Sequence, residues 1–219
     1  PDLRQNKQAF LQNLAEDYLG VSDTQAIIDA WQLFCDSFGQ YPFSIKMLYH
    51  SPMNYAVAYP LTLDYRDHPL GPSWIEHEPW GDRIDDCLEP FTIDQACQSF
   101  ATMERLWSQG LALYTPALND LKNKHVIEEL SCAKMIGCHL SAMRNIFEFH
   151  HHRKKIIQQL KLSTPCRIPA DQRTKELIEQ QRQVCYQALE LIQHDYRFGY
   201  HQEPHAHLYD ANKIKIAIE

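Results

Sequence analysis

Apolar residues recur at intervals of three and four along the first 39 residues, the spacing that places side chains on one face of an α-helix. A glycine follows each of two apolar stripes, at positions 20 and 39, where it can end a helix. The stripes are Leu3, Phe10, Leu11, Leu14 and Tyr18, then Ile27, Ala30, Trp31, Phe34 and Phe38. Two helices joined by a short turn predict an antiparallel helical hairpin over residues 2–39.

The helical spacing returns at residue 92 and continues to the end of the chain. Thr92 can cap a helix, Pro116 fits the first turn of the next one, and Asp210 can cap a short last helix. Long periodic segments cover roughly 124–161 and 171–196. Because strand-like alternation does not compete with this pattern, we expect an all-α protein, an antiparallel helical bundle.

Residues 40–91 lack the helical spacing and are rich in proline and aromatic residues. Seven of the chain's twelve prolines lie there, namely Pro42, Pro52, Pro60, Pro69, Pro72, Pro79 and Pro90. The many tyrosines and tryptophans need burial or a ligand, so disorder is not expected, and long loops in compact domains usually have a function. We predict a single helical domain over 1–219, with one long irregular insertion at 40–91 and helices over 92–219.

The charge and cysteine content narrow the range of partners. The formal net charge is −7, and no basic tract is longer than Arg153–Lys155, which argues against nucleic acid. No apolar run approaches the ~20 residues of a membrane span, so no membrane partner is expected. Seven cysteines without C-x-x-C spacing favour a reducing, cytoplasmic location. A start at Pro1 fits a processed protein or, as we expect, a fragment of a longer chain.

The segment "GPSWIEHEPWGDR" at 71–83 has the residue types of a sugar-binding surface. The apolar face of a sugar ring stacks on an indole, and its hydroxyls bind carboxylates and guanidinium groups. The candidates for substrate binding are Trp74, Trp80, Glu76, His77, Glu78, Asp82 and Arg83, together with Tyr49. The alternative is that both tryptophans attach the loop to the helices and that Asp82 and Arg83 form a local ion pair.

The segment "HDYRFGYHQEPHAHLYD" at 194–210 contains alternating potential metal ligands. An extended chain would project His201, Glu203, His205 and His207 to one side. Zinc sites usually take ligands from two parts of the chain, and no second group is evident. These four residues are therefore weak candidates, and no metal or cofactor is expected.

Two histidine positions lie within the long periodic segment 124–161. The consecutive residues His150, His151 and His152 point in three directions on a helix, so they do not chelate one ion together, and a solvated basic face is expected. His139 falls on the apolar stripe, where a hydrogen-bonded core histidine is expected rather than a catalytic one.

Nucleophile elbows, phosphate-binding glycine loops and H-E-x-x-H are missing from the sequence. Glycoside hydrolysis needs two carboxylates on either side of the scissile bond. Glu76, Glu78 and Asp82 are of that type, but a sequence does not show their separation. No catalytic residue is therefore assigned.

Several motifs together resemble a known group of proteins. "AWQLFCDSFGQYPFS", "LYHSPMNYAVAYPL", "GPSW...P.GDR", "PFT" and the closing "DYRFGYHQEPHAHLYDANKIKIAI" are similar to the helical region that follows the catalytic barrel in certain large bacterial glycoside-hydrolase-like proteins. The resemblance implies an accessory domain whose catalytic barrel lies upstream in the same polypeptide, with the catalytic carboxylates outside this chain. The 40–91 loop would then pack on the barrel and help to bind a glycan.

Two other functions remain open at this point. One is a stand-alone helical protein-interaction or oligomerisation module without a sugar role, since an aromatic surface with an acidic rim also suits an interface. A homo-oligomer is compatible with either function. The other is a metal-dependent enzyme built on the histidine-rich segment at 201–207.

Overall fold

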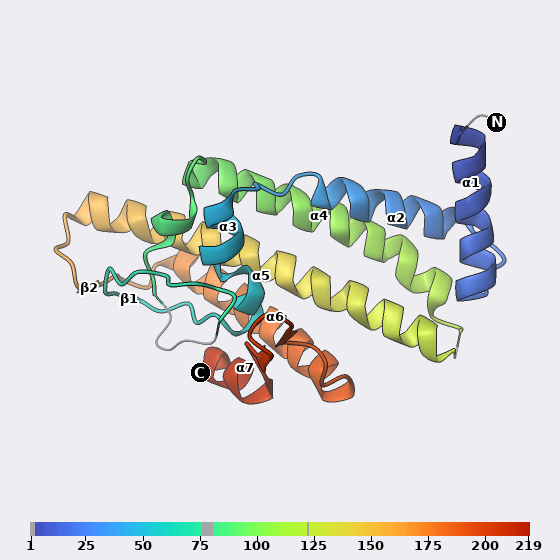
Figure 1. The fold of residues 1–219 in the computed structure, drawn as a ribbon. Helices are drawn as coiled ribbons and strands as arrows, with labels where there is room; N and C mark the ends of the chain where they lie inside the picture. The colour runs from blue at the N-terminus through green and yellow to red at the C-terminus, as the bar shows by residue number, and fades with distance from the viewer. Residues whose placement is uncertain (1–2, 76–80, 122) are drawn as a thin grey trace. The chain divides into compact units, whose positions relative to one another are not determined.

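The computed structural model describes residues 3–75, 81–121 and 123–219, with the side chains of residues 3–6 excepted (Figure 1). The prediction of an all-α helical bundle is confirmed. Within the described residues there are seven α-helices, and the strands form only two antiparallel pairs of two residues each. None of the described helices is long and apolar enough to cross a bilayer.

The chain divides into two compact units. One comprises Pro1–Tyr41 and Thr102–Gly137, and the other comprises Pro42–Ala101 and Cys138–Glu219. Two long helices, α4 (Ile93–Leu118) and α5 (Lys124–Leu160), each contribute a part to both units. The single domain over 1–219 stays a prediction.

The first unit begins with α1 (Leu3–Leu14), which continues through a π-helical turn (Ala15–Leu19) and is followed by α2 (Gln25–Phe38). Gly20 ends the first helical segment in the left-handed conformation, with φ of 75°, as predicted. Figure 1 shows α1 crossing the end of α2 steeply, so the two helices do not lie side by side as the predicted hairpin over 2–39 required.

Helix α2 packs closely on α4 within the first unit. Phe34 stacks on Trp107 with ring centroids 4.1 Å apart, and the Trp107 indole donates to the carbonyl of Ala133 on α5 at 2.8 Å. A side chain at Gly110 would come within 2.4 Å of the Phe34 ring. The missing side chain at position 110 therefore makes the close packing of these helices possible.

The predicted helix starts are confirmed by capping hydrogen bonds. Thr92 and Gln95 form a capping box before α4, with distances of 3.2 and 2.9 Å. Asp171 caps α6 (Gln172–His194), and Asp210 caps α7 (Ala211–Ile218). The prediction for Pro116 is wrong, since this residue lies in the last turn of α4. At that position the missing N–H removes only one helical hydrogen bond.

In the second unit, the described part of segment 40–91 is more regular than predicted. It contains α3 (Ile45–His50), two 3₁₀-helices (Pro52–Ala58 and Ile84–Cys87) and strand β1 (Asp64–Tyr65). Strand β1 pairs with β2 (Cys166–Arg167). Helices of four to seven residues are too short for an apolar spacing to repeat, so no periodic pattern appears in the sequence.

Helices α5 and α6 hold this segment through buried polar contacts. Gln181 on α6 donates to the carbonyl of Ala56 at 3.0 Å. His139 on α5 lies 3.0 Å from the carbonyl of Met53 and 2.8 Å from the Tyr209 hydroxyl. Because a carbonyl only accepts, His139 is protonated on Nδ1, and Tyr209 donates to Nε2. His139 is thus a hydrogen-bonded structural histidine, as predicted.

Candidate functional site

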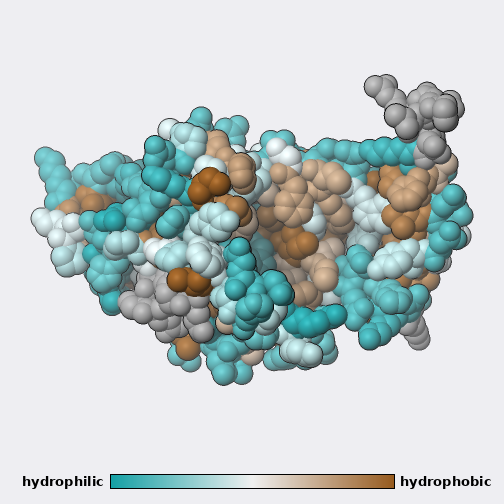
Figure 2. Space-filling model, viewed as in Figure 1, coloured by the Kyte–Doolittle hydropathy of each residue, from teal (hydrophilic) through white to brown (hydrophobic). Residues whose placement is uncertain are grey.

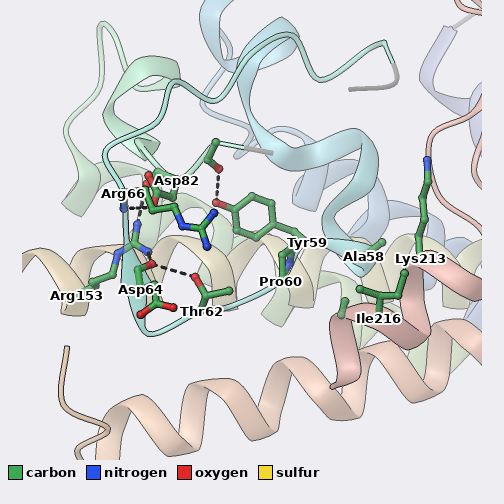
Figure 3. A pocket seen from close by; sticks show the side chains of 12 residues that line it. Ala58, Tyr59, Pro60, Thr62, Asp64, Arg66, Asp82, Arg153, Lys213 and Ile216 are labelled. Atoms are coloured by element: carbon green, nitrogen blue, oxygen red, sulfur yellow. Dashed lines mark hydrogen bonds between the residues drawn. The ribbon is translucent and has the colours of Figure 1, made fainter. Parts of the chain in front are cut away.

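A cavity of about 280 Å³ opens in the second unit beside the start of β1, α5 and α7 (Figure 3). We call it the arginine cavity. It is lined by Ala58, Tyr59, Pro60, Thr62, Asp64, Arg66, Gly81, Asp82, Arg153, Lys213, Ile216 and Ala217. A second cavity of about 220 Å³ shares Asp82 and Arg153 with it, so Arg153 lies at the boundary between the two.

Arg153 is buried, with 3% of its surface exposed. Its Nη2 donates to the carbonyl of Asp82 at 2.7 Å, and its Nη1 lies 3.5 Å from the carbonyl of Asp64. The guanidinium lies over the Tyr65 ring, 4.5 Å from the centroid. Within the described part of the chain it forms no ion pair with a carboxylate. Burial lowers the pKa of Arg153 below its ordinary value.

His150 connects Arg153 to Tyr59 by a chain of hydrogen bonds whose directions are fixed. Nη2 of Arg153 lies 2.7 Å from His150 Nδ1, and a guanidinium only donates, so Nδ1 is the acceptor. The imidazole proton is therefore on Nε2, which donates to the Tyr59 hydroxyl at 3.1 Å. Tyr59 in turn donates to the carbonyl of Gly81 at 2.9 Å (Figure 3). Burial and the neighbouring Arg153 lower the pKa of His150 well below its usual value, which keeps the ring neutral.

Asp82 organises the backbone on one side of the cavity. Its carboxylate accepts from the backbone N–H of Arg66 at 2.7 Å and of His68 at 2.9 Å. Next to it, a Cβ at position 81 would lie 1.7 Å from the carbonyl oxygen of Pro69, so only glycine fits there. The Asp82 carboxylate is thus engaged in holding the segment that presents Arg66.

The side chains that face the cavity have an excess of positive charge. The Asp64 carboxylate is paired with Arg167 at 2.9 Å, outside the cavity lining. Arg66 is exposed, and its guanidinium pairs with no described residue. Figure 3 shows the Arg66 side chain extending towards Tyr59, while Lys213 lies on α7 at the far side. An anionic ligand would therefore meet cations from three different elements.

The structure brings together only some of the residues predicted to bind a sugar. Trp74 is half-buried and contacts Tyr49 edge to face, with centroids 6.1 Å apart. Arg83 pairs with Asp86 at 2.7 Å, so the predicted alternative of an Asp82–Arg83 ion pair is wrong. Asp82 lines the arginine cavity, whereas the other predicted residues Trp80, Glu76, His77 and Glu78 lie outside the described residues.

The predicted extended arrangement of His201, Glu203, His205 and His207 is wrong. Strand β3 (Tyr200–His201) pairs antiparallel with β4 (Ala206–His207), and the chain reverses between them. The reversal turns the alternating side chains away from a common side. Over the described ranges, no three His, Cys, Asp or Glu side chains gather in a way that could hold a metal ion.

The prediction of a solvated basic face at 150–155 is wrong for two of its members. His150 and Arg153 are each only 3% exposed, whereas Lys154 and Lys155 are exposed. A signal for this was present in the sequence. Positions 143, 146, 150 and 153 continue one helical stripe from the buried Met143 and Ile146, so both polar residues fall on the buried face.

In comparisons with known proteins, no family model, curated protein or solved structure matches this chain.

Proposed function

We propose that this chain is the helical accessory domain of a carbohydrate-active, glycoside-hydrolase-like enzyme, and that it binds a glycan in the arginine cavity. The catalytic barrel and its carboxylates would belong to the same polypeptide outside this chain, and segment 40–91 would pack on the barrel. The observation that supports the proposal is the mixed lining of the cavity, which is apolar on one part and rich in donors and acceptors on the other.

A sugar ring requires this combination of surfaces. Its C–H face packs on apolar groups, here Pro60 and Ile216, and its hydroxyls bind charged side chains such as Arg66 and Asp64. A volume of about 280 Å³ is near the lower end of small-molecule sites, which run from roughly 300 to 1,000 Å³. The cavity therefore fits one sugar unit of a longer chain.

The test is saturation-transfer NMR of the whole chain with a panel of oligosaccharides. Thr62 lines the cavity and is exposed, so Thr62→Tyr fills the cavity without disturbing the core. We expect this variant to lose glycan signals and to keep the wild-type melting temperature. The matched control is Gln159→Tyr, at an exposed position on α5 that lines neither cavity. Equal loss in both variants, or no signal from any glycan, would contradict the proposal.

The same NMR experiment distinguishes the cavity from the surface at Trp74. If Trp74 is the stacking platform, Trp74→Ala reduces glycan binding and Thr62→Tyr does not. If Trp74 only attaches its segment through Tyr49, Trp74→Ala lowers the melting temperature and leaves the binding of the folded fraction unchanged.

A protein-interaction or oligomerisation module is the second candidate, favoured by an apolar row on the first unit. Phe10, Leu14 and Tyr18 follow one another at intervals of four, with exposures of 62%, 37% and 44%. Figure 2 shows hydrophobic residues at the surface in the region of α1. Light scattering over a range of concentrations tests this candidate, which predicts a mass that rises with concentration and falls in Phe10→Ser.

A further inference from the structure

We propose that the arginine cavity recognises a carboxylate group, so that its ligand is an acidic sugar such as a uronic acid. The sugar part of this inference rests on the proposed function, whereas the carboxylate part rests on the cavity alone. Three features of the cavity support it, which are the partners of Arg153, the balance of charge and the setting of Arg66.

The first feature is a buried cation that forms no ion pair with a described carboxylate, although the charge of Asp82 acts on it from nearby. The partners of Arg153 are two backbone carbonyls, a neutral imidazole and the Tyr65 ring. Taking a charge out of water is costly unless an opposite charge compensates it. The Nε–H and one N–H of Nη1 have no partner among the described residues. Because Arg153 borders both cavities, an anion that enters the arginine cavity would supply the missing negative charge.

The neighbours of Arg153 reinforce this requirement. His150 is held neutral as an acceptor, so it does not compete with an anion by adding a second buried cation. The Tyr59 hydroxyl accepts a hydrogen bond from the Nε2–H of His150 and donates one to the carbonyl of Gly81. These hydrogen bonds fix the position of Arg153 in the absence of ligand, which reduces the entropy lost on binding.

The second feature is the balance of charge, which selects the type of anion. Among the described lining residues three are cationic and two anionic, namely Arg66, Arg153 and Lys213 against Asp64 and Asp82. Over the lining residues alone the excess is a single positive charge, since Arg167, which pairs with Asp64, lies outside the lining. It matches a carboxylate, with one negative charge, better than a phosphate monoester, which has close to two at neutral pH. Asp82, which forms no ion pair with a described residue, would repel the second charge of a phosphate.

The third feature is the setting of Arg66. Its backbone N–H is bound by Asp82, so its attachment point is fixed, while its guanidinium has no described partner. An arginine in this setting can bind a carboxylate by two parallel hydrogen bonds. Arg66 therefore supplies the outer contact, and Arg153 supplies the buried charge.

The experiment is calorimetric titration of the whole chain with glucuronate, glucose, glucose 6-phosphate and cyclohexanecarboxylate. We expect glucuronate to bind at least about tenfold more tightly than glucose, since a charge-assisted hydrogen bond contributes more than a tenfold gain in affinity. It should also bind more tightly than glucose 6-phosphate, whose second negative charge exceeds the single excess positive charge of the lining. Arg66→Gln should lose this tenfold preference. The control Lys155→Gln removes the same charge from the exposed side of α5 and should not alter it.

The outcomes separate the carboxylate inference from the glycan proposal. Equal binding of glucuronate and glucose, unchanged in Arg66→Gln, overturns the inference and leaves the glycan function standing. Binding of cyclohexanecarboxylate as tight as that of glucuronate supports carboxylate recognition and overturns its sugar part. A preference for glucose 6-phosphate overturns the choice of carboxylate, and binding of none of the four probes overturns the inference entirely. If Arg66→Gln melts early, Arg66→Lys and Lys213→Gln replace it, with the same expected loss of preference.

Discussion

Nη2 of Arg153 lies 2.7 Å from Nδ1 of His150, and each residue has only 3% of its surface exposed. The two side chains come from adjacent turns of α5, three positions apart. The guanidinium cation is stable next to this imidazole only because the ring accepts a hydrogen bond from it and stays neutral. Arg153 and Tyr59 line the arginine cavity, and His150, which lines the second cavity, connects them by hydrogen bonds.

Removing the Tyr59 hydroxyl should destabilise the second unit. Tyr59→Phe leaves the Nε2–H of buried His150 without its acceptor, and an unsatisfied buried donor costs about 1–3 kcal/mol. Urea denaturation should therefore show a free energy of unfolding lower by about that amount. Tyr186→Phe is the control, because Tyr186 is half exposed, and it should be neutral. An equally stable Tyr59→Phe would mean that the hydrogen-bond chain does not contribute to folding.

Stability should fall between pH 6.5 and about 4 because of His139. Burial lowers the pKa of this histidine to about 4 in the folded state, against about 6.5 in the unfolded chain. Below pH 6.5 His139 is therefore protonated in the unfolded state, whereas in the folded state it stays neutral down to about pH 4. The contribution of His139 to the free energy of unfolding is fully present above pH 6.5. As the pH falls to 4, the free energy of unfolding decreases by up to about 3 kcal/mol. Buried His150 acts in the same direction.

The variant His139→Gln isolates this contribution. Glutamine can donate to the Met53 carbonyl and accept from Tyr209 but does not titrate. The free energy of unfolding of His139→Gln should therefore depend less on pH between 6.5 and 4 than that of the wild type. His194→Gln, at an exposed position, should keep the wild-type slope. Parallel curves for His139→Gln and the wild type would contradict the assignment.

Gly81→Ala should disrupt the arginine cavity. The new methyl group would lie 1.7 Å from the Pro69 carbonyl oxygen, so the backbone has to move, at a cost of roughly 1–3 kcal/mol or more. The shift should also weaken the binding of any ligand in the cavity, because the Gly81 carbonyl accepts a hydrogen bond from Tyr59, which lines the cavity. Gly39→Ala is the control, since φ is −61° there and the nearest atom is 3.3 Å away. Thermal melting of the two variants compares them directly.

Gly110→Ala should destabilise the first unit although alanine favours helices by about 1 kcal/mol. The methyl group would approach the Phe34 ring to 2.4 Å, and this ring is already packed on Trp107. We expect a net loss of about 1–2 kcal/mol. The matched change Gly137→Ala meets the flexible end of Leu111 at 3.0 Å and the Trp107 ring at 3.3 Å, both farther away than the Phe34 ring is from position 110, and should be milder. A more stable Gly110→Ala would show that α2 has room to move.

The sequence predicted the long helices well because each repeats its apolar spacing over several turns. The segment expected at 124–161 is α5 at Lys124–Leu160, and the caps at Thr92 and Asp210 are in place. The 3₁₀-helices of segment 40–91 were missed because helices of four and seven residues are too short to repeat an apolar spacing. Steep packing of α1 on α2 depends on contacts that a one-dimensional pattern does not contain.

The candidate site was only partly predictable from the sequence. Asp82 was selected for its residue type, but its actual role, binding the backbone of residues 66 and 68, depends on a loop closed across sixteen positions. Arg153 was expected on a solvated basic face together with His150, because positions 150, 153 and 154 share one side of a helix. Extending the apolar stripe through 150 and 153 would have indicated burial, but the identity of the partners comes only from the fold.

The spacing of residues on α5 has a consequence for how the protein can evolve. His139, His150 and Arg153 all make contacts within the second unit from one helix, and each is held at a defined angle around the axis of that helix. Inserting or deleting one residue between 139 and 150 would rotate every later side chain by about 100° and move Arg153 out of the cavity. Among related chains, length changes should therefore be confined to loops, and the eleven-residue interval from His139 to His150 should stay constant even where side chains differ.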